Sequence, residues 1–105
     1  MGIGTNSPSQ KLTIDGGNVT IKNTNPTLYM RDTDNRSAMI HTNANTLYFL
    51  RGSGNDSESW AQYNGQWPLV INLENNDATF GGNIAVRGSI KHTTGGDICI
   101  GNTCP

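Results

Sequence analysis

The fold class is decided by the stretch Leu12-Thr13-Ile14-Asp15-Gly16-Gly17-Asn18-Val19-Thr20-Ile21. Leu12 and Ile14 are separated by one polar residue, and so are Val19 and Ile21. This alternation is typical of β-strands, because successive side chains of a strand point to opposite faces of a sheet. The intervening Asp-Gly-Gly-Asn favours a turn, since glycine supplies the positive φ that tight hairpins require. The stretch therefore predicts two short strands joined by a turn.

Part of this stretch recurs along the chain. The pattern Gly-Gly-(Asn/Asp)-(Val/Ile)-x-(Ile/Val) occurs at 16–21, 81–86 and 95–100. The first eight residues, MGIGTNSP, are echoed by the last eight, ICIGNTCP. Segmental repetition builds long objects more often than catalytic pockets. We therefore expect a segment of a longer, repetitive protein.

The remaining sequence has strand signals and almost no helix signal, which predicts a meander of short strands. Asn64-Gly65 is the strongest hairpin signal, because both residues tolerate the positive φ of a type I′ turn. The segment 51–57 is expected to be the longest loop, and 32–37 a polar turn whose Asp and Asn side chains bond local backbone. The expected strands are 27–31, 38–41, 47–50, 60–63, 66–73 and 78–80, with a further turn at 42–45.

Composition limits the possible functions. The chain has 105 residues, a formal net charge of −1 and only 14% charged residues. This length fits one domain or less, and the lack of a basic surface argues against nucleic-acid binding. No apolar run is long enough to insert into a membrane as a spanning segment. Large aliphatic residues are few, so one chain alone would build a thin core, and we expect an obligate oligomer that buries apolar surface between chains.

The N-terminal residues resemble a segment of bacteriophage tail-fibre proteins. The sequence GIGTNSPSQKL at 2–12 is similar to segments that read V-G-I-G-T-T-S-P-x-x-K-L, with Met1 in place of Val and Asn6 in place of Thr. The stretches 25–34 and 76–84 also look like tail-fibre sequence, so the resemblance covers about half of the chain. Similar motifs occur in bacterial adhesins and pilus-tip proteins. The resemblance implies parallel homotrimers in which three chains wrap around one axis.

The strand pattern and the resemblance together predict an all-β fold. It is a short-strand meander within an intertwined parallel homotrimer, a fibre segment of the β-prism or triple-β-helix type. We divide the chain into a repeat-start strand and hairpin at 1–24, a β-meander at 25–77, and Gly-Gly hairpin repeats at 78–105. Strands that close between chains would also hide sheet edges. The residues expected in the trimer core are Leu12, Ile14, Val19, Ile21, Ile84, Val86, Ile98 and Ile100.

An aromatic hairpin is the main candidate binding site. Both tryptophans of the chain, Trp60 and Trp67, flank the Asn64-Gly65 turn among Gln and Asn residues. Sugars stack on aromatic faces and bond to amides, which suits this mixture; the alternative is that these rings pack inside a thin trimer. Trp67 is expected to be packed, because Pro68 stiffens its backbone, and Trp60 to be exposed. The candidate ligand-binding residues are Trp60, Gln62, Tyr63 and Asn64.

Two groups of residues resemble metal ligands, but each has a simpler explanation. Asp32, Asp34 and Asn35 offer oxygen ligands to calcium, yet the stretch lacks the glycine and distal Glu of an EF-hand, so a plain Asx turn is expected. His41 and His92 could form three-His rings on a trimer axis, although lone histidines are more often surface or packed residues. We therefore predict no metal and no cofactor.

The sequence gives no sign of catalysis. No pair of carboxylates is placed as a glycosidase requires, and no nucleophile has a local signature, so we expect no enzyme. Cys99 and Cys104 are too few for a structural zinc site and are expected to be structural or incidental, with a spacing that allows a small loop closure.

The sequence therefore indicates an extracellular structural segment of a virion tail fibre. Its expected partners are two further copies of the chain, the adjoining fibre segments, and a host-surface glycan or protein. Two alternatives remain open: a glycan-binding receptor module, and the stalk of a bacterial adhesin or pilus-tip protein.

Overall fold

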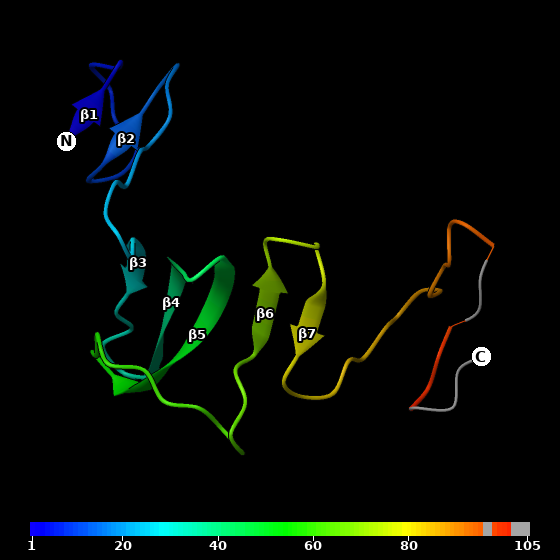
Figure 1. The fold of residues 1–105 in the computed structure, drawn as a ribbon. Coiled ribbons are helices and arrows are strands. Elements are labelled where there is room, and N and C mark those ends of the chain that lie inside the picture. Colours follow the sequence, from blue (N-terminus) through cyan, green and yellow to red (C-terminus); the bar gives the residue numbers. More distant parts are fainter. Residues whose placement is uncertain (96–97, 102–105) are drawn as a thin grey trace.

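The computed structural model describes residues 1–95 and 98–101, and within them the protein is all-β (Figure 1). Every regular element of these residues is a strand, as the sequence predicts. The strands are β1 (Gly2–Ile3), β2 (Thr13–Ile14), β3 (Thr27–Met30), β4 (Arg36–Asn43), β5 (Thr46–Asn55), β6 (Leu69–Asn72) and β7 (Ala78–Phe80). None of the described residues belongs to a helix that could cross a bilayer.

The main sheet is an antiparallel meander of five strands in the order β3-β4-β5-β6-β7 (Figure 1). Each strand therefore pairs with its neighbour in sequence, as predicted. A tight turn joins β4 to β5, and its central residues Ala44 and Asn45 have φ angles of 50° and 59°. Positive φ at both positions matches the right-handed twist of the flanking strands. This hairpin sets the register that pairs Met39 with Leu50.

β5 is longer than the sequence predicts. The expected loop at 51–57 is wrong, because β5 continues through Gly52 to Asn55. Gly52 is buried, and a Cβ atom at this position would lie 2.6 Å from the carbonyl oxygen of Ser37. The glycine thus allows β4 and β5 to approach closely, next to an irregularity in β4 between Arg36 and Ala38.

The first half of β5 pairs with β6, whereas its second half is hydrogen bonded to residues 59–61. The Ser53 N–H donates to the Ser59 carbonyl at 2.9 Å, and the Ala61 N–H donates to the Arg51 carbonyl at 2.9 Å. The strands predicted at 60–63 and 66–73 are therefore wrong in extent. The first is reduced to isolated bridges, and the second is β6 alone. The segment after β5 lies where β6 would otherwise continue.

Substituting Gly52 tests this close approach. We expect Gly52→Ala to lower the free energy of unfolding by about 1–3 kcal/mol, because the added methyl group meets backbone rather than a flexible side chain. Gly54→Ala is the matched control on the same strand, since a Cβ there meets nothing within 4 Å. Urea denaturation followed by tryptophan fluorescence measures both variants. Equal stability of the two would contradict the close packing of β4 on β5.

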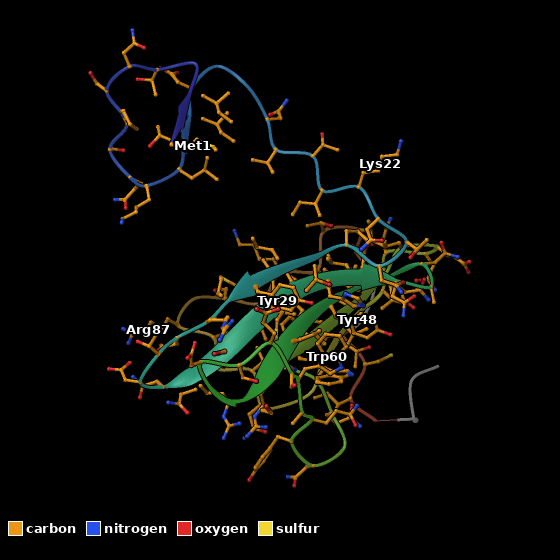
Figure 2. The ribbon with its side chains drawn as sticks, turned by 90° about the vertical axis from the view of Figure 1, so that its left-hand side faces the viewer. Met1, Lys22, Tyr29, Tyr48, Trp60 and Arg87 are labelled. Carbon is orange, nitrogen blue, oxygen red and sulfur yellow. The ribbon has the colours of Figure 1, made fainter. Side chains whose placement is uncertain are left out.

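A second, smaller sheet pairs β1 with β2 in parallel. The Thr13 N–H donates to the Met1 carbonyl at 2.8 Å, and the Asp15 N–H donates to the Ile3 carbonyl at 2.7 Å. The turn predicted at 15–18 begins with Gly16 at a φ of 73°. Figure 2 shows this small sheet, near Met1, at a distance from the main sheet and connected to it by an extended stretch through Lys22.

The strands predicted after the Gly-Gly turns are not formed within one chain. Residues 18–22, 83–86 and 98–100 have no strand assignment, so the hairpins expected in 1–24 and 78–105 are absent from the described residues. Residues 96–97 of the third copy lie outside the described ranges. For 18–22 and 83–86 the physical reason is that a strand needs a hydrogen-bonded neighbouring strand, and none is assigned beside these two segments among the described residues.

The single chain is more open than a globular domain of its size. Its radius of gyration is 18.1 Å, whereas a compact domain of this length has about 13 Å. Its solvent-accessible surface is 8638 Å², against about 5,700 Å² for a folded monomer of this mass. Met39 and Leu50, 1% and 4% exposed, are the buried hydrophobic residues of the described part. One chain therefore has a very small core.

Candidate functional site

Strand alternation gives the main sheet two chemically different faces. Residues that pair across neighbouring strands share a face, and successive residues of one strand alternate between faces. On one side, Ser37, Met39 and His41 of β4 are buried. We call this side the cleft face. The opposite side carries the residues between them and is called the apolar face.

One row of large apolar side chains crosses the whole apolar face. Leu28 pairs with Ile40, Ile40 with Phe49, Phe49 with Leu69, and Leu69 with Phe80, so all five strands contribute. Exposure of these side chains is 48% for Leu28, 36% for Phe49 and 50% for Phe80. The row is therefore open to solvent in the single chain.

Further apolar residues flank this row on both sides. The apolar residues of this face are Leu28, Met30, Ala38, Ile40, Leu47, Phe49, Leu69, Ile71, Ala78 and Phe80. Arg51, which pairs with Ala38, and Thr42, which pairs with Leu47, lie on the same face. None of the ten apolar residues is fully buried. A contiguous exposed patch of this kind marks an interaction surface, because soluble monomers seldom leave such patches uncovered.

The apolar face continues onto the segment that leads to β3. A groove of about 320 Å³ is lined by Val19 and Ile21 on one side and by Leu28, Ile40 and Thr42 on the other, with Pro26 and Thr27 between them. Val19 and Ile21 thus lie beside the main sheet although they belong to no strand.

The predicted trimer-core residues lie outside the main sheet. Ile14 is half-buried in β2, and the other seven are exposed in the single chain. Of these eight residues, Val19 and Ile21 line the groove beside the apolar face. The sequence analysis missed the ten residues of that face. They occupy alternate positions of each strand, but apolar residues also fill positions between them, as in Leu69-Val70-Ile71. Only the register between strands shows that they form one surface.

A second feature is an aromatic cleft on the cleft face. Its lining residues are His41, Asn43, Tyr48, Leu50, Trp60 and Trp67, and its volume is about 180 Å³. The ring of His41 lies 5.9 Å from that of Tyr48 and 5.4 Å from that of Trp60, tilted by 36° and 35°. Figure 2 shows Tyr48 and Trp60 close together on one side of the sheet. Four aromatic rings thus surround a small open space.

Backbone pairing positions the rings of this cleft. His41 and Tyr48 are direct partners on β4 and β5, and the Thr27 hydroxyl is hydrogen bonded to His41 Nδ1 at 2.6 Å. Trp60 stands opposite Gly52 in an isolated bridge, which brings its side chain to the same face. Ser37 of β4 takes up the space where a Gly52 side chain would lie.

The predicted ligand-binding residues are only partly brought together. Trp60 is 43% exposed and lines the cleft, as expected for an exposed ring, while Trp67 is half-buried, as expected for a packed one. Gln62, Tyr63 and Asn64 are exposed and do not line the cleft. The Arg51 guanidinium carbon lies 5.5 Å from the centre of the Tyr63 ring, a cation–π distance.

The predicted turn at 64–65 is confirmed. Asn64 and Gly65 have φ angles of 52° and 72°, and Tyr63 and Gln66 exchange two backbone hydrogen bonds of 3.0 Å. This type I′ geometry returns the chain toward β6. It therefore supplies Trp60 and Trp67 from the two arms of one hairpin.

The acidic turn after β3 is the Asx turn that the sequence predicts. The Asp32 carboxylate accepts hydrogen bonds from the backbone N–H groups of Asp34 and Asn35 at 3.2 and 3.0 Å. A hydrogen bond with the Asp34 side chain, together with these two, lowers the pKa of Asp32. No cluster of three or more metal-ligating side chains occurs in residues 1–95 and 98–101. His41 belongs to the cleft, and His92 contacts Thr94.

Arg31 links the end of β3 to the segment after β5. Its guanidinium pairs with Glu58 at 2.9 Å and with Asp56 at 3.1 Å. The hydrogen bond to Glu58 and the charge of Asp56 raise the pKa of Arg31. All three groups are exposed, so these ion pairs orient the segment more than they stabilise the fold.

Of the two cysteines, Cys99 is disulfide-bonded, and Cys104 lies outside the described residues.

No protein-family profile matches the chain, and no characterised protein is significantly similar to it. Its function therefore has to be inferred from its own residues and geometry.

Proposed function

We propose that this chain is a structural segment of a trimeric fibre of the phage tail-fibre type, in which three parallel copies pack their apolar faces around one axis. Its work is mechanical: it extends the fibre and holds a receptor-contacting surface away from the virion. The observation that supports this best is the row from Leu28 to Phe80, which crosses the five strands of the main sheet and is open to solvent in one chain.

The open shape of the chain supports the same proposal. A monomer with two buried hydrophobic residues in its described part and an excess of exposed surface gains little from folding alone. Three sheets packed face to face would place the ten residues of the apolar face in one shared core, with sheets about 10 Å apart. Segments 18–22 and 83–86, which have no strand partner among the described residues, would then find neighbouring strands in the other two copies.

The groove beside Val19 and Ile21 provides a test at the margin of the proposed interface. We expect Ile21→Asp to weaken the trimer by about 1–3 kcal/mol per chain, because a charge at the edge of an apolar interface loses solvation without gaining a partner. Thr20→Asp, one residue away, is the control and leaves assembly intact. Sedimentation velocity over a range of concentrations compares the two. Equal sedimentation of both variants and the native chain would show that this segment faces solvent in the assembly.

Two other functions remain candidates. The stalk of a bacterial adhesin or pilus-tip protein would use the same trimeric architecture, so the two are separated by location rather than by fold. Immunogold labelling with an antibody to this chain tests this on purified virions and on the bacteria that produce them. Labelling along the tail fibres supports the proposal, whereas labelling of the bacterial surface alone supports the adhesin. The other candidate, a glycan-binding module, is favoured by the aromatic cleft.

A further inference from the structure

The aromatic cleft has the composition of a site for a neutral ring. Its floor is formed by the buried residues His41 and Leu50, its walls by the half-buried Tyr48 and Trp67, and its rim by the exposed Trp60 and Asn43. Neither a carboxylate nor a Lys or Arg side chain lines it. An anionic ligand would find no cation here, and a cationic ligand would find no counter-charge beyond the ring faces.

Polar groups at the cleft are available for a ligand. Within residues 1–95 and 98–101, no hydrogen bond engages the Tyr48 hydroxyl, the Asn43 amide or the indole N–H groups of Trp60 and Trp67, and no buried side-chain polar atom lacks a partner. These groups are therefore in contact with solvent. A ligand that presents both an apolar ring face and several hydroxyl groups would use the rings and the amide together, whereas a purely apolar ligand would leave the polar groups unpaired.

Size limits the ligand further. A volume of about 180 Å³ is smaller than the pockets of about 300 Å³ and more that enclose drug-sized molecules. It admits one ring, while the rest of a longer molecule stays outside. The cleft also lies on the face of the sheet opposite to the apolar face, so it stays accessible if the apolar face is covered.

We infer that this cleft binds the terminal, uncharged pyranose of a glycan, which stacks on Trp60 and is hydrogen bonded by Asn43 and Tyr48. The inference rests on the proposed function for the outward orientation of the cleft, and it moves the binding site from the turn at 62–64 to residues of β4, β5 and the hairpin arms. Tyr63, at the turn itself, is outside the site.

The test is a titration of the full chain with methyl glycosides of glucose, galactose, mannose and N-acetylglucosamine, followed by NMR chemical shifts of the native protein. At least one of these sugars is expected to bind with a dissociation constant of about 1 mM, as befits a ligand of so few atoms, and to shift the signals of Tyr48, Trp60 and Asn43. Sialic acid, glucuronic acid and tetramethylammonium serve as charged comparisons and are expected not to saturate. Because these chemical-shift changes are measured on the native protein, they test whether the sugar binds in the cleft even if a substituted variant does not fold.

Two variants sharpen this test. Trp60→Ala is expected to weaken the binding at least tenfold, while Tyr63→Ala, which removes an exposed ring from the same hairpin, leaves it unchanged. The inference is overturned if no neutral sugar saturates, if a charged probe binds better, or if Tyr63→Ala weakens binding as much as Trp60→Ala. The mass of the protein in solution is measured in the same samples. A monomer that binds sugar would refute the proposed trimer but support the sugar site in the cleft. A trimer that binds no sugar would support the proposed trimer but refute the sugar site.

Discussion

Phe49→Asp is expected to convert the protein from a trimer into a poorly folded monomer. Phe49 is the central residue of the row across the apolar face, between Ile40 and Leu69. A carboxylate buried there without a partner costs several kcal/mol, and threefold symmetry repeats that cost in each chain. Light scattering after size-exclusion chromatography measures the mass, and circular dichroism measures the residual strand content.

Tyr29→Asp is the matched control for this substitution. Tyr29 is also an exposed aromatic residue, with an exposure of 42% against 36% for Phe49, but it pairs with Met39 and so lies on the cleft face. We expect Tyr29→Asp to keep the trimer. If both variants remain trimers, or if both dissociate, the assignment of the interface to one face of the sheet is wrong.

The second large effect is expected at Met39, the most deeply buried side chain in the described part of the chain. Met39→Ala should lower the free energy of unfolding by about 2–5 kcal/mol, because it leaves a cavity between the strands of a core that has few other members. Tyr29→Ala, at an exposed position on the neighbouring strand and outside the apolar face, should cost about 1 kcal/mol. Guanidinium denaturation of both variants provides the comparison. Equal destabilisation would mean that the cleft face does not form the core of the chain.

The local features of the fold could be predicted from the sequence because they depend on few residues. The Asn64-Gly65 turn needs only two residues that tolerate positive φ, and the Asx turn at Asp32 needs only one short side chain. The strands predicted at 27–31, 38–41 and 78–80 were confirmed as β3, β4 and β7 with shifts of no more than about two residues at their ends, and the strand predicted at 47–50 was confirmed only as the first half of β5. The glycine-rich part of β5 was missed because its strand conformation depends on the close approach of Ser37 to Gly52, which no local pattern encodes.

The candidate sites could be predicted only in part, because they combine distant residues. The apolar face can be recognised only from the register of five strands. Alternation within one strand shows which of its own residues share a side, but not which residues of the next strand lie on that side. In the aromatic cleft, the backbone bridge between Gly52 and Trp60 brings Trp60 next to His41 and Tyr48, which are distant in sequence. The sequence therefore indicated Trp60 correctly as a lining residue, but it indicated Gln62, Tyr63 and Asn64 as the other members of the site. Residues 18–22 and 83–86 have strand composition but no strand partner among the described residues of one chain, as expected of strands completed by another copy.

The most direct test of the trimer is the mass of the purified chain in solution, measured by light scattering at micromolar concentration. A trimer of the 11.3 kDa chain has a mass of about 34 kDa, and we expect this species to persist on dilution and to unfold in one cooperative transition. A compact monomer of 11.3 kDa that unfolds cooperatively would contradict the account, because the apolar face would then be stable in water without a partner.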